Sequence, residues 1–263
     1  MDLGLKGKRA VLVGATSGIG RAAAEALAAE GCNVAVCART QGNVDTTVAA
    51  LKAMGVQSTG AAVDVSDKAA YKGWIDSAAA ELGGIDIFAC FTSAGGGPAS
   101  EKSWRAGLEL DILPTFNGIQ AALPHLEKSD CGSIIIMATN VAIEPYFGPQ
   151  AYSAVKAALL NYAAALTKQL GPKNIRVNSI SPGPVFFEGG SWDQIKQARP
   201  ELYEATVKKV PLGRLGNGPE FGRAIAFLAS PAVPLMTGKT SASGCWKTSR
   251  TSSRSWAVWS SPP

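Results

Sequence analysis

Tyr152 and Lys156 are the residue pair best suited to acid–base chemistry, and they stand four positions apart in a stretch that predicts a helix. That spacing places both side chains on one helix face, one turn apart. An ammonium beside a phenol favours the phenolate. The phenol can then exchange a proton with a carbonyl or alcohol oxygen while a hydride moves to or from the carbon.

Thr139 lies at the end of a predicted strand and could donate a second hydrogen bond to the same oxygen. Each of the three residues also has a structural interpretation. Tyr152 and Lys156 suit an amphipathic helix with a half-buried ring and an extended lysine, and Thr139 suits a strand end. The other motifs of the chain must therefore show whether the catalytic or the structural interpretation of these residues holds.

A glycine-rich turn connects the first predicted strand, Arg9–Val13, to a predicted helix, Gly18–Glu30. Glycine lets the backbone approach a pyrophosphate closely, and the free N–H groups of a helix N-terminus attract its charge. The alternative is a plain tight turn that packs a strand against a helix. The turn residues expected to contact a dinucleotide are Gly14, Thr16, Ser17, Gly18, Ile19 and Gly20.

The end of the second predicted strand, Asn33–Ala38, tests the choice of cofactor. NAD sites usually carry an acid there, bonded to the ribose 2′-hydroxyl. Ala38 takes that position and Arg39 follows, and an arginine can pair with a 2′-phosphate. The sequence therefore favours NADP(H) and leaves NAD(H) open, since Arg39 also fits a solvated surface residue.

Asp64 and Val65 follow the third predicted strand, Gln57–Val63, and are further candidates for the cofactor site. The Asp64 carboxylate could accept a hydrogen bond from an adenine amino group. It could instead cap the next helix, a role for which Asp67 competes.

Short apolar runs alternate with longer helical stretches through most of the chain. Continuous apolar runs are typical of strands buried on both faces, and the alternation predicts a parallel, doubly wound sheet. The predicted fold class is thus α/β, a Rossmann fold in a single domain over residues 1–238, with ligands beyond the carboxyl ends of the strands. The other predicted elements are strands Ile85–Phe91, Gly132–Ala138 and Ile175–Ile180, and helices Asn43–Met54, Lys68–Leu82, Ser103–Leu126, Gln150–Leu170 and Pro219–Ser230.

Two segments depart from this alternation. Residues 184–210 are rich in Pro, Gly and aromatics and contain two short helical stretches, Ser191–Ala198 and Glu201–Lys208, which predict a substrate lid. Residues 239–263 are dominated by Ser, Thr, Lys and Arg and show neither strand alternation nor a helical face. We expect this tail to be poorly ordered and the last strand of the sheet to be missing.

The composition excludes several classes of protein. Hydrophobic residues make up 46% of the 263 positions and charged residues 17%, which supports a sizeable core and argues against disorder. Lys and Arg form no basic stripe, so a nucleic-acid partner is disfavoured. The five cysteines have no CxxC spacing, which argues against a metal site and for a reducing compartment. With no signal-peptide pattern and no bilayer-spanning run, we expect a cytoplasmic protein without a membrane partner.

Taken together, these motifs resemble the classical short-chain dehydrogenase/reductase family, most closely its 3-oxoacyl-carrier-protein-reductase-like branch. The resemblance covers residues 3–238 and rests on four features in the expected order. These are the glycine turn, Thr139 thirteen residues before Tyr152, the Tyr152–Lys156 pair and the Pro182–Gly183 turn after the sixth strand. The resemblance implies a Rossmann fold that transfers hydride between a nicotinamide and a carbonyl or alcohol.

The resemblance also implies roles for further residues. Lys156 and Tyr152 would contact the nicotinamide ribose, and a homotetramer or homodimer would form on the two long helices within 103–126 and 150–170. The cofactor would be contacted as well by Ser93, Ala94, Gly95, Pro182, Gly183 and Val185.

Four departures from the family pattern bear on activity. Thr139 replaces a serine, and Thr92–Gly95 replaces Asn-Asn-Ala-Gly. Asp111 replaces a helix asparagine that is thought to hold a proton-relay water. If its carboxylate lies beside Lys156, it would oppose the effect of the lysine on Tyr152. If it faces elsewhere, the replacement would leave the activity unaffected. The tail replaces the usual last strand, and its abrupt change of composition suggests a shifted reading frame.

The expected substrate is an apolar or aromatic ketone, a 3-oxoacyl compound or the corresponding secondary alcohol. Aromatic residues gather in the segments near Thr139 and Tyr152, and those assigned to the substrate are Tyr146, Phe186, Phe187 and Trp192. Two other hypotheses stay open. One is a catalytically impaired nucleotide-binding or structural subunit, which the departures suggest; the other is an NADP-using dehydratase or epimerase.

Overall fold

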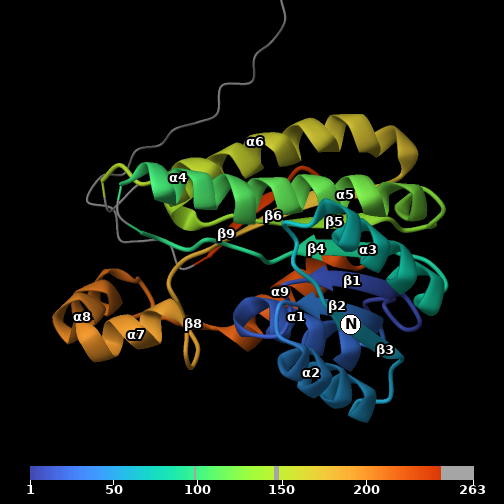
Figure 1. The fold of residues 1–263 in the computed structure, drawn as a ribbon, viewed down its shortest axis with the longest axis horizontal. Coiled ribbons are helices and arrows are strands. Elements are labelled where there is room, and N and C mark those ends of the chain that lie inside the picture. Colours follow the sequence, from blue (N-terminus) through green and yellow to red (C-terminus); the bar gives the residue numbers. More distant parts are fainter. Residues whose placement is uncertain (98, 145–147, 244–263) are drawn as a thin grey trace, which may run out of the picture.

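A seven-stranded parallel sheet forms the centre of the molecule (Figure 1). The computed structural model describes residues 1–97, 99–144 and 148–243. The strand order is β3-β2-β1-β4-β5-β6-β9, so the chain reverses its direction of winding between β1 and β4. The strands of the sheet are β1 Arg9–Val13, β2 Asn33–Ala38, β3 Ser58–Ala62, β4 Ile87–Cys90, β5 Ser133–Met137, β6 Arg176–Pro182 and β9 Thr240–Ser243. The predicted doubly wound fold is confirmed.

Helices cover both faces of the sheet, as Figure 1 shows, because successive strand residues point to opposite faces. Ala10 and Leu12 of β1 pack into the core beneath α1, α2 and α9, whereas Val11 and Val13 pack into the core beneath α3, α5 and α6. The first layer consists of α1 Gly18–Ala29, α2 Gln41–Ala53 and α9 Gly218–Ala229. The second consists of α3 Lys68–Leu82, α4 Glu101–Gly107, α5 Leu113–Leu126 and α6 Ala151–Leu170.

The predicted continuous helix Ser103–Leu126 is wrong in one respect. A π-helical segment, η1 Leu108–Ile112, interrupts it and separates α4 from α5. Such a segment rotates the residues on either side of it relative to an unbroken α-helix, and π-bulges often occur at functional sites. Here it carries Asp111, whose side chain is buried.

The segment of residues 184–210 forms a unit with two helices at one end of the sheet (Figure 1). Two-residue strands β7 Val185–Phe186 and β8 Gly216–Asn217 pair in parallel, and between them lie α7 Ser191–Ala198 and α8 Pro200–Lys209. The two helices predicted in this segment are present. Short 3-10 turns, η2 Asn140–Ala142 and η3 Gly171–Lys173, flank α6.

The expectation that order ends at Gly238 is wrong for the first residues of the tail. Thr240–Ser243 forms β9, which pairs in parallel with β6 from Ser179 to Pro182. Parallel pairing is made by main-chain groups, so a polar strand can add to an edge that offers unpaired N–H and C=O groups. Residues 244–263 lie outside the described part of the chain.

Within the described residues, no helix has both the length and the apolar character needed to cross a membrane.

Helices α1 and α9 approach closely at Gly222, where an added β-carbon would overlap the carbonyl oxygen of Ala22. Gly222→Ala should therefore lower the free energy of unfolding by about 1–3 kcal/mol through overpacking. Gly73→Ala is the matched control, because Gly73 lies in helix α3 and a β-carbon there meets nothing within 4 Å. It should be neutral or stabilising by up to about 1 kcal/mol. Urea unfolding monitored by circular dichroism tests both, and equal effects would contradict this account of the α1–α9 contact.

Candidate active site

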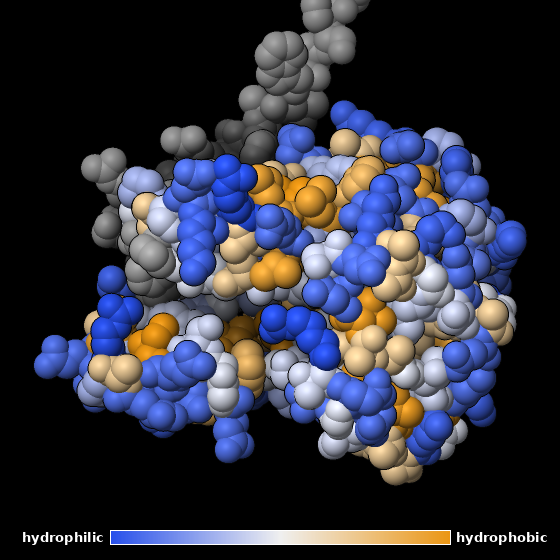
Figure 2. Space-filling view, in the orientation of Figure 1, coloured by the Kyte–Doolittle hydropathy of each residue, from blue (hydrophilic) through white to orange (hydrophobic). Residues whose placement is uncertain are grey.

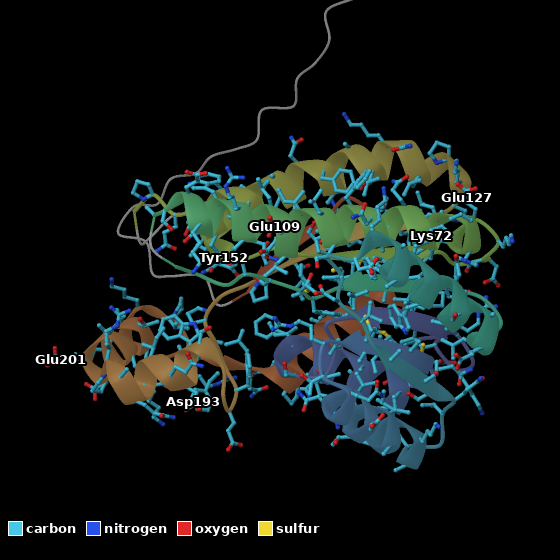
Figure 3. All side chains as sticks on the ribbon, viewed as in Figure 1. Lys72, Glu109, Glu127, Tyr152, Asp193 and Glu201 are labelled. Carbon is cyan, nitrogen blue, oxygen red and sulfur yellow. The ribbon has the colours of Figure 1, made fainter. Side chains whose placement is uncertain are left out.

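Thr139, Tyr152 and Lys156 line one cavity of about 830 Å³ at the carboxyl end of the sheet. Thr139 follows the end of β5, and Tyr152 and Lys156 lie in the first two turns of α6. Tyr152 is half-buried, while Thr139 and Lys156 are buried. The structure thus brings the three sequence-predicted residues to one wall of a cleft. Figure 3 shows Tyr152 between the α4–α6 layer and the α7–α8 unit.

Among the described residues, the Thr139 hydroxyl has only long contacts. Its Oγ1 lies 3.5 Å from the carbonyl oxygen of Pro182 and 3.5 Å from Asn140 Oδ1. Hydrogen bonds of that length are weak, so little holds the hydroxyl in one rotamer. A substrate oxygen in the cavity can therefore compete for its proton.

The Lys156 ammonium is fixed by two groups, a backbone carbonyl and a carboxylate. Its Nζ donates to the carbonyl oxygen of Met137 at 3.0 Å and lies 2.8 Å from Asp111 Oδ1. The second contact is an ion pair without the alignment of a hydrogen bond. The other carboxylate oxygen of Asp111, Oδ2, accepts a hydrogen bond from the backbone N–H of Ala94 at 2.9 Å. Of the two orientations left open for Asp111, the one toward Lys156 is the one observed.

Asp111 takes the position of the proton-relay asparagine and is therefore expected among the catalytic residues, but it does not line the cavity. Its side chain is 1% exposed and contacts the Lys156 ammonium at 2.8 Å. Ala94 is likewise absent from the lining, and its N–H donates to Asp111. Asp111 therefore contributes to the site through Lys156 and through the backbone of Ala94.

The glycine turn has the geometry of an anion cradle. Gly14 and Gly18 have φ of +70° and +53°, a region that side chains other than glycine disfavour. A β-carbon at Gly20 would lie 2.7 Å from the carbonyl oxygen of Gly14. Ser17, the N-cap of α1, makes no side-chain capping bond, so the first N–H groups of the helix stay available for an anion. These residues fit the pyrophosphate of a dinucleotide.

A second pocket of about 160 Å³ continues from the glycine turn toward β2 and β3. Gly14, Ser17 and Ser93 line both this pocket and the larger cavity, so the two form one continuous groove. The smaller pocket gathers Arg39, Asp64 and Val65, which are predicted at the ends of the second and third strands for the cofactor site, with Thr16 of the glycine turn.

The alternative role of Asp64 as a helix cap is taken by Asp67. The Asp67 side chain accepts bonds from the N–H groups of Ala69 and Ala70 at the start of α3. Asp64 instead accepts from the backbone N–H and the hydroxyl of Ser66, which hold the pKa of its carboxyl below the usual value, with a smaller contribution from Arg39. It stays ionised and exposed at the pocket.

Residues of the loop after β6 and of the segment 184–210 also line the cleft. Pro182, Gly183 and Val185 line the cavity, as do Ser93 and Gly95 from the loop after β4. Phe187 and Trp192 also line it, and the Phe187 ring lies over Gly18, where an added β-carbon would be 2.8 Å away.

Two residues assigned to the substrate are not placed in the cleft. Phe186 does not line the cavity; its ring lies 6.4 Å from that of Tyr203, within the α7–α8 unit. Successive residues of an extended segment face opposite sides, so Phe186 points away while its neighbours face the cavity. Tyr146 lies outside the described residues.

Sequence reasoning missed several lining residues. Gln150 is the N-cap of α6, and Arg199 lies at the junction of α7 and α8 at the outer part of the cleft. The position of Gln150 directly before the tyrosine turn is a signal that could have found it. The others missed include Phe91, Met137, Asn140, Val141, Ile195 and Leu202.

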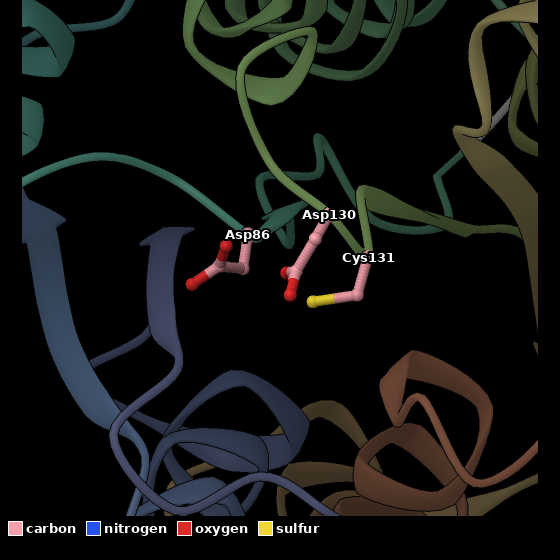
Figure 4. A group of neighbouring side chains, drawn as sticks. All are labelled: Asp86, Asp130 and Cys131. Atoms are coloured by element: carbon pink, nitrogen blue, oxygen red, sulfur yellow. The ribbon is translucent and has the colours of Figure 1, made fainter.

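A second polar cluster, formed by Asp86, Asp130 and Cys131, lies at the opposite, amino-terminal edge of the sheet (Figure 4). Its two carboxylates are already compensated, since Arg9 pairs with Asp86 at 2.7 Å and Lys8 with Asp130 at 2.9 Å. Burial alone would raise the pKa of Asp86, but the bonds from Arg9 and Ser129 outweigh it and hold that pKa below its usual value. The cluster therefore takes part in an ion-pair network, in which Arg9 and Asp86 join β1 to the start of β4.

Comparison with known proteins places the chain in a family. The family profile described as enoyl-(acyl carrier protein) reductase matches residues 14–243. Isoepoxydon dehydrogenase patN of Penicillium expansum is 36% identical over 244 residues, which cover 90% of this chain and 93% of that protein. The chain belongs to the classical short-chain dehydrogenase/reductase family, whose members are oxidoreductases acting on alcohols and ketones with a nicotinamide cofactor.

Two solved structures show the same architecture. L-Sorbose reductase of Gluconobacter frateurii, in complex with NADPH and L-sorbose, superimposes with a TM-score of 0.83 at 26% identity over 92% of this chain and 97% of that one. NAD⁺-bound xylitol dehydrogenase superimposes with a TM-score of 0.85 at 25% identity over 92% and 99%. Relatives with this fold therefore bind either dinucleotide.

Proposed function

We propose that this chain transfers a hydride between NADP(H) and a ketone or secondary alcohol, with Tyr152 as the acid–base residue. The observation that carries the proposal is the continuous groove, in which the glycine turn and the Tyr152 wall are two parts of one cavity. A dinucleotide whose pyrophosphate rests on the α1 N-terminus could extend from the Arg39 pocket to Tyr152. When bound, it supplies or accepts the hydride.

In the direction of reduction, Tyr152 donates its phenolic proton to the carbonyl oxygen as the carbon is reduced, and the alcohol is formed. Thr139 donates a hydrogen bond to the same oxygen and so holds the carbonyl in place. Lys156, fixed by Met137 and Asp111, stabilises the phenolate that remains. Oxidation of the alcohol uses the same groups in reverse.

The preference for NADP(H) rests on Arg39. Its guanidinium is exposed at the pocket that would take the adenosine ribose, beside Ala38, which offers no carboxylate to a 2′-hydroxyl. A guanidinium can bind a 2′-phosphate with two parallel hydrogen bonds. Use of NAD(H) as a second cofactor stays compatible with this site.

The substrate is proposed to be an apolar or aromatic ketone, a 3-oxoacyl compound or the corresponding alcohol. Support comes from the side chains that line the cleft beyond Tyr152, which are largely apolar: Met137, Val141, Phe187, Trp192, Ile195 and Leu202. Residues 184–210, which include α7 and α8, would close over the bound substrate and exclude water.

We further propose that the protein is cytoplasmic. The four cysteines in the described part of the chain, Cys32, Cys37, Cys90 and Cys131, are all free thiols. Burial raises the pKa of the Cys32 and Cys37 thiols, so they are unreactive core residues. Unpaired cysteines of this kind are typical of a reducing compartment.

The proposed assembly is a homotetramer or homodimer built on the α4–α5–α6 face. Trp104, Leu108, Leu113 and Phe116 are 42–49% exposed there, and Phe116 lies 6.3 Å from the Tyr162 ring of α6, centroid to centroid. Figure 2 shows apolar surface over this part of the molecule. Exposed apolar residues clustered on one face are typical of a subunit interface.

Tyr152→Phe tests the proposed activity. Loss of the phenolic proton should lower kcat by about 10²–10⁴-fold and leave the dissociation constant for NADPH nearly unchanged. Tyr162→Phe is the matched control, since it makes the same change in the same helix at a residue outside the cavity lining, and it should keep full activity. Steady-state assays on a panel of ketones and alcohols would measure both. Full activity in Tyr152→Phe would refute the mechanism, whereas NADPH binding without turnover in the wild type would favour the impaired-subunit hypothesis.

Arg39→Ala tests the proposed cofactor preference. Removing a charge-assisted contact to the 2′-phosphate should raise the dissociation constant for NADPH by about tenfold while changing that for NADH by less than about twofold. Arg105→Ala is the control, because Arg105 pairs with Glu101 on α4, away from the pocket. Fluorescence titration with both dinucleotides provides the measurement. An equal loss of affinity for both would show that Arg39 does not read the phosphate.

Leu113→Asp tests the proposed assembly face. A buried aspartate at a subunit interface costs several kcal/mol, so the variant should shift to smaller species. Leu212→Asp is the control, because Leu212 lies in the loop after α8 and is 79% exposed, compared with 49% for Leu113. This change should leave the assembly unaltered. Light scattering coupled to size-exclusion chromatography reports the mass, and an unchanged mass for Leu113→Asp would place the interface elsewhere.

A further inference from the structure

The ion pair between Lys156 and Asp111 is almost fully withdrawn from solvent, with the two side chains 4% and 1% exposed. An ammonium buried without a partner destabilises the fold, and a carboxylate at 2.8 Å offsets this cost. The carboxylate is itself fixed, because Oδ2 is bonded to the N–H of Ala94 while Oδ1 faces Lys156. Asp111 therefore cannot turn into the cleft without losing both contacts.

The two charges of this pair act together on the phenol of Tyr152. Lys156 and Tyr152 both line the cavity, whereas Asp111 is not among the lining residues. A positive charge alone favours the phenolate. A negative charge 2.8 Å from the ammonium reduces that effect, because the phenol then experiences an ion pair rather than a net charge. A neutral side chain at position 111 would leave the full effect of the ammonium.

We propose that Asp111 is a positioning residue that holds the Lys156 ammonium and weakens its effect on Tyr152. The proposal rests on the function proposed above for Tyr152. Alcohol oxidation uses the phenolate, so a weaker effect of the ammonium moves the pH dependence of the oxidation rate toward higher pH and leaves the equilibrium between ketone and alcohol unchanged.

The other ionisable groups near α6 are exposed or have partners elsewhere. The Lys156–Asp111 pair is therefore the dominant charge near Tyr152. On η1, Glu109 is exposed, and Figure 3 shows it on the helix layer rather than in the cleft. On α4, Glu101 and Arg105 pair with each other at the surface. On η3, Lys173 pairs with Glu127, and on β6 the Arg176 guanidinium donates to carbonyl oxygens at the end of α9.

The remaining groups belong to the loop after η2 and to the lid. Glu144 is exposed and has partners of its own. Arg199 is exposed at the outer part of the cleft. Among the lining residues that the structure describes, the ionisable groups of the larger cavity are Tyr152, Lys156 and Arg199, so Lys156 is the cation that shares a helix face with the phenol.

Asp111→Asn removes the charge and keeps the shape of the side chain. In the cofactor-free protein, the part of the phenolate absorbance that Tyr152→Phe removes belongs to Tyr152. The titration midpoint of that part should be lower in Asp111→Asn than in the wild type by about one pH unit. The acid limb of the pH profile for alcohol oxidation should move in the same direction. Glu109→Gln, which removes an exposed carboxylate from the same π-helical segment, is the control and should move neither.

The outcomes separate the two proposals. An unchanged or raised midpoint in Asp111→Asn would overturn the role of Asp111, as would a uniform loss of activity with no change in the profile. If Asp111→Asn does not fold, Asp111→Ser removes the same charge with a smaller side chain and must lower the midpoint likewise. If the wild type shows no turnover that depends on Tyr152, the proposed function fails, while the absorbance titration still reports whether Asp111 acts on the phenol.

Discussion

The buried ammonium of Lys156 is the constraint on which the rest of the site depends. It joins segments that are distant in the sequence: helix α6, which carries it; the end of β5, through Met137; and the π-helical segment η1, through Asp111. Asp111 in turn fixes Ala94 in the loop after β4. Because a buried charge must be compensated, none of these segments can shift independently, and Tyr152, one turn before Lys156, is held at the cavity wall.

The sheet topology explains why this wall faces a phosphate cradle. The winding reverses between β1 and β4, so the loops that follow these two strands separate and leave a crevice at the carboxyl edge. The glycine turn after β1 lines one side of the crevice, and Ser93 and Gly95 after β4 line the other. Strands β5 and β6 then place Thr139 and Pro182 at the same edge. One continuous groove therefore follows from the strand order.

Local signals made most of the fold and the site predictable. The glycine turn, Thr139, Tyr152 and Lys156 lie at strand ends and helix starts, where sequence patterns are strongest. The π-helical break between α4 and α5 was not predicted, because hydrophobic periodicity does not reveal one inserted residue. Strand β9 was missed because its pairing with β6 uses main-chain groups that composition does not report. The sequence left open whether Asp111 faces Lys156, since that depends on the rotation that η1 introduces. Phe186 was assigned to the substrate together with Phe187, although neighbouring residues of an extended segment face opposite sides.

The measurement that tests the central claim most directly is a crystal structure of the chain with NADP⁺ bound. The account predicts that the pyrophosphate lies on the N-terminus of α1, that the 2′-phosphate lies against Arg39, and that the nicotinamide faces the hydroxyls of Tyr152 and Thr139. A dinucleotide bound elsewhere, or a Tyr152 hydroxyl turned away from the nicotinamide, would contradict it.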